Sequence, residues 1–256
     1  MFATRLPLFT LVAILATLMV NTLSNFFPPG GQNVGEISNT VLSGVLITPA
    51  NYAFAIWGLI YIGLIAYGVY QLRLHPRKDP TIQRASQLLI VACLAQVVWI
   101  PLFTLQWFWA SVGVMLLILL PLMGAYLALH TPNQNIRPSR QRQWYAQIPF
   151  SVYLGWISVA TVVNVAAALY TSNWNGFGLS QIGWTVVMIV IAAAIAAIVA
   201  IQRGDVAFVL VFVWALSAIA VRHTTLPAIW MPAAILVVGL IGLLIGRGII
   251  MVKILR

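Results

Sequence analysis

Three apolar stretches of the chain carry neutral polar and aromatic residues at helical spacing. The stretches are PANYAFAIWGLIY, QVVWIPLF and YLGWISVATVVN. Within each stretch the selected residues are three or four positions apart, so they share one face of a helix. The candidate site residues are Trp57, Tyr61, Gln96, Trp99, Trp156, Ala160 and Asn164.

The amides among these residues allow two interpretations. A buried amide such as that of Gln96 or Asn164 must find hydrogen-bond partners when hydrocarbon surrounds its helix. In the first interpretation the amides join neighbouring helices, and each contributes about 0.6–2 kcal/mol. In the second they orient a ligand in a pocket that has apolar and aromatic walls. The residue types alone favour the first interpretation.

Ionisable residues are missing from the middle of the apolar stretches. Glu36, Asp79 and Asp205 fall in or beside connectors. Intramembrane carboxylates are the usual mark of ion coupling, so a proton- or sodium-driven symporter is disfavoured. The spacing of Cys and His fits no metal site, and we expect neither a catalytic site nor a required cofactor. His130 and His223 could ligate a haem iron, but polar residues at the water boundary are the simpler interpretation.

The composition is that of a membrane protein. Of the 256 residues, 62% are hydrophobic and 6% are charged, and the mean hydropathy is +1.01. A soluble domain carries about 25% charged residues, so lipid must solvate most of this surface. Because one span takes about 20 apolar residues, the apolar content suffices for roughly eight transmembrane helices. We therefore expect an all-α integral membrane protein in contact with the lipid bilayer.

The apolar runs define the expected spans, and the longest connector, Leu23–Asn51, is polar and rich in proline and glycine. The first run could instead belong to a signal peptide, because Met1–Arg5 is a short basic segment, but no clear cleavage site follows it. The expected spans are Leu6–Thr22, Tyr52–Leu72, Leu88–Phe103, Ser111–Leu129, Ile148–Tyr170, Ile182–Ile201, Val206–Val221 and Ile229–Ile249.

The basic residues predict the orientation of the spans. The chain has 13 Lys and Arg and a net charge of +10. If both termini are cytoplasmic, only Arg222 lies outside, as the positive-inside rule favours. The basic residues then form no single patch, so nucleic-acid binding is not expected. We expect instead a multi-pass protein of the plasma membrane. The cytoplasmic ones are Arg5, Arg73, Arg77, Lys78, Arg84, Arg137, Arg140, Arg142, Arg203, Arg247, Lys253 and Arg256.

This topology places three candidate residues at one depth in the membrane. The third and fifth spans run outward and the second runs inward, so Trp57, Trp99 and Asn164 lie in the outer half, roughly 6–9 Å from the boundary. A buried indole N–H also needs a partner. Trp214, in the seventh span, has only Ser217 as a polar neighbour within a turn, and we interpret it as a core residue.

The three stretches resemble the hallmark segments of the TspO/MBR family, the tryptophan-rich sensory proteins and translocator proteins. The third stretch is the most specific, since Trp156, Ala160 and Asn164 have the family spacing. The first stretch is one residue shorter than usual between Phe54 and Trp57. Two substitutions also depart from the family pattern: Tyr52 stands where the family often has Trp, and Gln96 where it tends to have Asn.

The resemblance covers roughly Leu6–Tyr170. It implies the family's five-helix bundle for residues 1–170 and leaves residues 171–256 as a three-helix extension without a counterpart. It also implies a small-molecule site between the first, second, third and fifth spans, covered by the first connector. All seven candidate residues fall on the family's pocket-lining positions, where Ala160 would leave room for a flat ligand.

With the resemblance, the pocket becomes the favoured interpretation. The chain is then a receptor, sensor or carrier for a hydrophobic planar molecule, and a tetrapyrrole such as haem or protoporphyrin is the ligand that the family implies. Two alternatives stay open. One is a secondary transporter without buried carboxylates, for which internal repeats are expected and none is convincing. The other is a non-catalytic assembly subunit of a membrane complex.

Small residues in the extension permit close helix packing. Gly242 and Gly246 form a G-x-x-x-G pair, a weak signal for helix association. Packing within the chain is favoured over a homodimer. The small residues concerned are Ala192, Ala193, Ala196, Gly239, Gly242 and Gly246.

Overall fold

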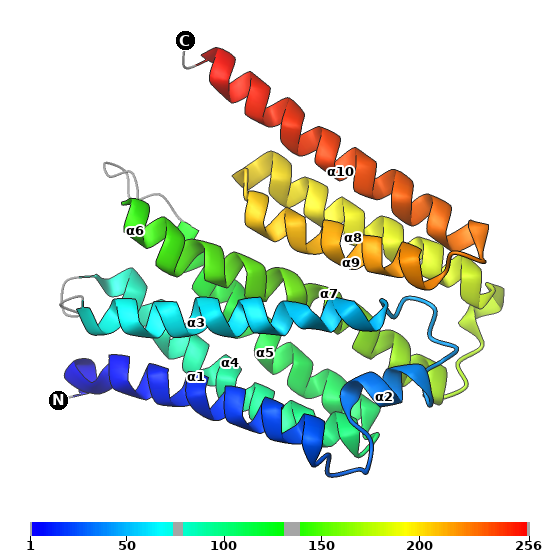
Figure 1. The fold of residues 1–256 in the computed structure, drawn as a ribbon, viewed down its shortest axis with the longest axis horizontal. Coiled ribbons are helices and arrows are strands. Elements are labelled where there is room, and N and C mark those ends of the chain that lie inside the picture. The colour runs from blue at the N-terminus through cyan, green and yellow to red at the C-terminus, as the bar shows by residue number, and fades with distance from the viewer. Residues whose placement is uncertain (1, 74–78, 131–138, 255–256) are drawn as a thin grey trace.

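In the part of the chain that the structure describes, eight long helices alternate in direction and make up most of the residues (Figure 1). The computed structural model describes residues 2–73, 79–130 and 139–254, and it contains no β-strand within these ranges. Seven of the helices are long and apolar enough to cross a membrane, while α9 is apolar but has only 17 residues. The chain is therefore an all-α, multi-pass membrane protein, which confirms the expected fold class.

Each expected span lies within one of the helical segments. The second span comprises a 3-10 turn, η1, and the helix that follows it, and the fifth is preceded without a break by α6 and the π-helical turn η3. The long helices are α1 (Phe2–Phe26), α3 (Ile56–Arg73), α4 (Pro80–Thr104), α5 (Phe108–His130), α7 (Ile148–Thr171), α8 (Gln181–Arg203), α9 (Val206–Arg222) and α10 (Pro227–Ile254). The short elements are α2 (Val34–Asn39), η1 (Asn51–Ala55), α6 (Arg140–Arg142), η3 (Gln143–Gln147) and η4 (Gly176–Gly178).

The three acidic residues lie at the starts of helices and accept hydrogen bonds from backbone amides there. Asp79 accepts hydrogen bonds from the first amides of α4, and Asp205 accepts one from the first turn of α9. Glu36 closes a capping box with Asn33 at the start of α2. Each carboxylate satisfies amides that have no partner within the helix and meets the positive end of the helix dipole.

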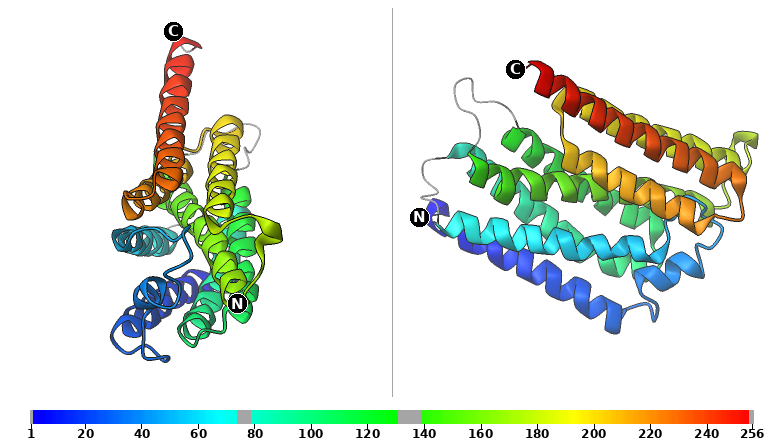
Figure 2. Two further views of the ribbon diagram at one scale, coloured as in Figure 1. Left: turned by 90° about the vertical axis from the view of Figure 1, so that its right-hand side faces the viewer. Right: turned by 45° about the horizontal axis from the view of Figure 1, so that its top comes forward.

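Five of the long helices form a closed ring. α1 packs on α3, α3 on α7, α7 on α5, α5 on α4, and α4 returns to α1. α8, α9 and α10 contact one another and form a second group, which joins the ring where α9 packs on α7 (Figures 1 and 2). The ring encloses the candidate site, and α2 covers one of its ends.

Basic residues gather at the opposite end of the molecule from α2. Because the helices alternate in direction, Arg5, Arg73 and Arg203 lie at the end where α1 begins and α10 ends (left in Figure 1). Arg222, at the end of α9, lies at the other end. The structure thus separates the cations as the charge pattern predicts, and the orientation in the membrane stays a prediction. His75, Arg77, Lys78, Arg137, Arg256 and the side chain of Lys253 lie outside the described residues.

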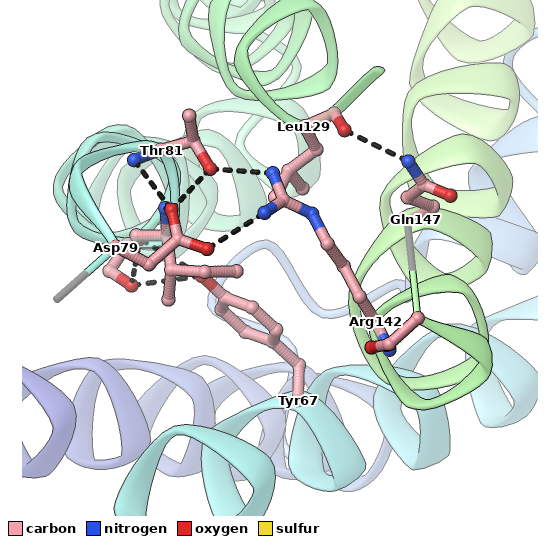
Figure 3. Close-up of polar contacts among 9 residues, drawn as sticks. Tyr67, Asp79, Thr81, Leu129, Arg142 and Gln147 are labelled. Atoms are coloured by element: carbon pink, nitrogen blue, oxygen red, sulfur yellow. Dashed lines mark hydrogen bonds and ion pairs between the residues drawn. The ribbon is translucent and has the colours of Figure 1, made fainter. Parts of the chain in front are cut away.

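An ion pair joins α4 to α6 at this basic end (Figure 3). The guanidinium of Arg142 donates to the carboxylate of Asp79 at 2.7 Å and to the hydroxyl of Thr81 at 2.5 Å. Burial of the Asp79 carboxyl opposes its ionisation, but the hydrogen bonds from Thr81 and the charge of Arg142 outweigh this, so the pKa of Asp79 lies below its usual 3.8. The pair therefore contributes stability only while Asp79 is ionised.

The glycines of α10 do not pack within the chain as predicted. A Cβ atom built at Gly239, Gly242 or Gly246 would meet nothing within 4 Å among the described residues. α10 contacts its neighbours through another face, on which Ala233 and Leu240 are buried. The interpretation that Gly242 and Gly246 serve intramolecular packing is therefore wrong, whereas the small residues of α8 (Ala192, Ala193 and Ala196) are buried. A homodimer stays a prediction.

Candidate functional site

A cavity of about 400 Å³ lies within the five-helix ring, under the segment that contains α2. Every helix of the ring contributes to its wall, and neutral polar side chains alternate there with aromatic ones. Six of the seven predicted site residues line it: Trp57, Gln96, Trp99, Trp156, Ala160 and Asn164. Residues from three separate sequence stretches thus meet at one site.

Residues 33–55, which include α2 and η1, close the end of this cavity that lies away from the basic end of the molecule, and we call them the lid. The lid is well packed: Ile37 and Leu42 are almost fully buried. The segment leading to it also approaches the ring closely, because a Cβ at Gly30 would lie 1.9 Å from the carbonyl oxygen of Thr104. The sequence indicated a connector that is not a span, and the structure shows an ordered cover. The lid also supplies the amides of Asn33, Asn39 and Asn51 to the lining.

Asn164 is held by two hydrogen bonds across the ring. Its Oδ1 accepts from the indole N–H of Trp99 at 2.7 Å, and its Nδ2 donates to the hydroxyl of Ser111 at 2.8 Å. Ser111 in turn donates to the carbonyl of Phe108. The bonds connect α4, α7 and α5, so Asn164 joins helices as in the first interpretation, although it also lines the cavity.

Gln96 differs from Asn164 in its hydrogen bonding. Its side chain is fully buried and lines the cavity, yet neither Oε1 nor Nε2 has a hydrogen-bond partner among the described residues. Leaving a buried polar group unpaired costs about 1–3 kcal/mol, so such a group calls for an explanation. Gln96 therefore does not join helices through a hydrogen bond among the described residues, and its one acceptor and two donors are left without a partner there.

Aromatic pairs form the walls. Phe54 meets Trp156 edge to face at 6.1 Å, and Trp99 stacks on Phe103 at 4.9 Å. Tyr61 does not line the cavity: it stacks on Trp57 with the ring centres 5.7 Å apart, and its buried hydroxyl has no partner among the described residues. Its position supports the wall from behind.

Two of the polar residues around the site were not assigned to it from the sequence. Ser111 was assigned only to the start of a span, and its bond to Asn164 depends on how α5 packs on α7. Trp214 was interpreted as core, but its indole N–H donates to the carbonyl of Ala53 in the lid at 3.0 Å. Because the partner lies 161 residues away in the sequence, no local pattern could have revealed it.

The two described histidines lie outside the cavity. His223 Nε2 lies 2.8 Å from the carbonyl oxygen of Leu46. Burial lowers the pKa of His223 below 6.5, and the charge of Arg222 adds to this, while the bond to Leu46 opposes it. His130 is engaged at Nδ1 by the carbonyl of Tyr126. Neither imidazole points into the cavity lining, so a ligand there would not be bound through them.

A serine, a histidine and an aspartate also meet at the basic end, but not as a nucleophile and its base. Ser151 donates to the carboxylate of Asp205 at 2.6 Å, and His130 Nε2 lies 3.4 Å from the same hydroxyl and 3.6 Å from the same carboxylate. In an activated serine the aspartate orients the other nitrogen of the imidazole. Here the three side chains instead join α5 and α7 to the start of α9.

A second, more open groove of about 1030 Å³ lies between α7, α8 and residues 173–181. Its wall is mostly apolar and includes the aromatic residues Tyr170, Trp174 and Trp184. The indole N–H of Trp184 already donates to the carbonyl of Gly176. None of the seven candidate residues lines this groove, so the enclosed cavity is the better candidate for a specific site.

The fold and the cavity define a class: a multi-pass membrane protein with a lidded, aromatic, intramembrane site. Within this class, a family model described as TSPO-like protein matches residues 7–246. The chain therefore belongs to the TSPO-like protein family. The match continues beyond Tyr170 through α8 and α9 into α10, so the family pattern includes the helices that the five-helix resemblance left without a counterpart. No curated protein and no solved structure matched the chain.

Proposed function

We propose that the protein is a membrane-embedded receptor or carrier for a hydrophobic, planar small molecule that binds in the lidded cavity. The observation that carries this proposal is the fully buried amide of Gln96, which lines the cavity without a hydrogen-bond partner among the described residues. A helix-joining amide would be bonded to another helix, as that of Asn164 is. A volume of about 400 Å³ lies within the range of small-molecule sites, roughly 300–1,000 Å³.

The lining also indicates what kind of ligand would fit. Trp57, Trp99 and Trp156 offer flat apolar surfaces, and aromatic rings bind planar molecules by offset stacking or edge contacts. Among the described residues, Glu36 is the only charged one in the lining, and it lies in the lid. A flat ligand whose apolar body lies between the rings and whose polar edge reaches Gln96 matches this wall. A tetrapyrrole is such a molecule, and the charge pattern predicts that it enters from the non-cytoplasmic half.

Titration of the purified protein in lipid nanodiscs with protoporphyrin tests the proposal. We expect saturable binding, followed by the porphyrin absorbance, that weakens at least severalfold in Trp156→Leu. Trp144→Leu is the matched control, because Trp144 is 58% exposed and lies outside the cavity lining. Equal affinity of Trp156→Leu and the wild type would contradict the cavity as the site.

Two other outcomes would favour the alternative functions. Stable co-purification with a partner protein, together with no binding of protoporphyrin, would point to an assembly subunit. Ligand-dependent uptake into proteoliposomes would make the protein a transporter and would retain the cavity as its binding site.

A further inference from the structure

The lid has a second neighbour besides the ring, namely α9. η1, the last element of the lid, packs on α9. Several lid residues that line the cavity also form hydrogen bonds with α9 on the side away from the cavity. α9 belongs to the second group of helices. The cover of the cavity is thus held by an element that contributes nothing to the cavity wall.

Arg222, at the end of α9, binds the lid at three acceptors. One guanidinium nitrogen donates to Oδ1 of Asn39 at 3.1 Å and to the carbonyl of Pro49 at 3.2 Å, and the other donates to the carbonyl of Ser38 at 3.2 Å. All three acceptor residues line the cavity. Hydrogen bonds from a charged donor are about twice as strong as neutral ones, and these three would be lost together if the lid moved away.

Further contacts run along α9 below Arg222. The amide of Ala50 donates to the carbonyl of Ala218 at 3.1 Å, and the indole N–H of Trp214 donates to the carbonyl of Ala53 at 3.0 Å. The ring of Trp214 also meets that of Tyr52 edge to face at 5.2 Å. The bonded lid residues extend from Ser38 to Ala53, so α9 holds most of the lid rather than one point of it.

We propose that α9 is a latch that keeps the lid closed, and that ligand exchange with the cavity requires the contacts of Arg222 and Trp214 with the lid to break. This inference rests on the proposed function and assigns a role to the second group of helices. Arg222 and Trp214 are positioning residues: they touch the lid and not the cavity. Replacing either residue should therefore change the rates of ligand entry and release, and it should have a smaller effect on the contacts that a ligand makes inside the closed cavity.

Hydrogen exchange of the lid amides, measured by mass spectrometry in nanodiscs without any ligand, tests the latch directly. In Arg222→Gln we expect residues 38–53 to exchange on the order of tenfold faster than in the wild type, since a charged donor with several acceptors is lost. Trp214→Phe keeps an aromatic ring beside Tyr52 but removes the indole N–H with its five-membered ring, so it should accelerate exchange near Ala53. It is expected to fold even if Arg222→Gln does not. Arg203→Gln is the matched control, because it removes the same charge at the other end and Arg203 lies over the ring of Tyr126.

Stopped-flow release of protoporphyrin provides the second measurement. Release should accelerate in Arg222→Gln and Trp214→Phe by a similar factor to the exchange of the lid, and it should stay at the wild-type rate in Arg203→Gln. Wild-type exchange and wild-type release in both α9 variants would overturn the latch. If the wild type binds no protoporphyrin, the proposed function fails with this ligand, and the exchange measurement alone decides whether α9 holds the lid.

Discussion

The indole N–H of Trp99 lies 2.7 Å from Oδ1 of Asn164, so two residues that are 65 positions apart in the sequence share a hydrogen bond across the five-helix ring. Asn164 uses its remaining donor on Ser111. Gln96, one helical turn before Trp99, has no such partner among the described residues. The site therefore combines an amide whose hydrogen bonds join helices with an amide that has no partner among the described residues.

The bond between Trp99 and Asn164 should be measurable as a coupling energy. In a double-mutant cycle of Trp99→Phe and Asn164→Leu, we expect the two losses in the free energy of unfolding to be non-additive by about 0.6–1.7 kcal/mol, the range found for hydrogen bonds within membranes. A cycle of Trp109→Phe and Asn164→Leu should be additive, because Trp109 donates to Ser172 instead. Additivity in the first cycle would refute the bond.

Tyr61 should support the cavity through its ring and not through its hydroxyl. Because the hydroxyl is buried without a partner among the described residues, Tyr61→Phe should leave the melting temperature unchanged or raise it, and protoporphyrin affinity should be retained. Tyr61→Leu removes the stacking on Trp57, worth about 0.5–1.5 kcal/mol, and should lower both the melting temperature and the affinity for protoporphyrin. Thermal unfolding and titration measure the two effects, and equal losses in both variants would show that the hydroxyl matters.

The ion pair of Asp79 and Arg142 should make stability depend on pH in the acidic range. Because the pKa of Asp79 is lowered on folding from about 3.8, its contribution is present above that value and is lost as the pH falls through the folded-state pKa. The melting temperature of the wild type should therefore exceed that of Asp79→Asn at pH 7, and the difference should shrink between pH 5 and 3. Asn still caps α4, so the variant isolates the charge.

Arg142→Gln is the companion variant for that experiment, since it removes the cation of the pair and leaves the Asp79 carboxylate in place as the cap of α4. Its melting temperature should likewise lie below that of the wild type at pH 7, and the difference should shrink as the pH falls through the folded-state pKa of Asp79. A difference between Asp79→Asn and the wild type that does not depend on pH would contradict the stabilising role of the ionised carboxylate.

Two glycines near the lid should differ in their tolerance of a methyl group. At Gly30 a Cβ would lie 1.9 Å from a backbone oxygen of α4, whereas at Gly44 it would lie 2.5 Å from the hydroxyl oxygen of Tyr170. A side chain can rotate away and a helix backbone cannot, so Gly30→Ala should cost about 1–3 kcal/mol and Gly44→Ala less. Thermal unfolding provides the comparison, and the reverse order would contradict the packing of this segment on the ring.

Much of the fold could be predicted because its signals are local. Apolar runs of span length define the long helices, and the alternation of cations matches the alternation of their directions. The seven candidate residues were found from helical spacing and family resemblance, and six of them line one cavity. The position of Tyr61 behind the wall was not predicted, because spacing along a helix does not determine which neighbouring ring a side chain meets.

The contacts between the two groups of helices could not be predicted. Arg222 was recognised only as the single outer cation, and its acceptor Asn39 lies 183 residues away. The glycines of α10 have the spacing of a helix-packing motif, yet none of Gly239, Gly242 and Gly246 meets another helix closely among the described residues. The spacing indicates that another helix could approach closely, but it does not indicate where such a helix lies. The hydrogen bond of Trp214 could not be predicted either, because its acceptor is a backbone carbonyl, and every residue type carries one.

The affinity of Gln96→Leu for protoporphyrin tests the central claim most directly. The substitution removes the unpartnered amide at similar volume, so we expect on the order of tenfold weaker binding than in the wild type, without a lower melting temperature of the ligand-free protein. Gln71→Leu is the matched control: Gln71 is equally buried and lies outside the cavity, and its Oε1 accepts from Ser86. It should lose stability and keep its affinity. Wild-type affinity in Gln96→Leu, together with a lower melting temperature, would show that Gln96 joins helices and would contradict the account.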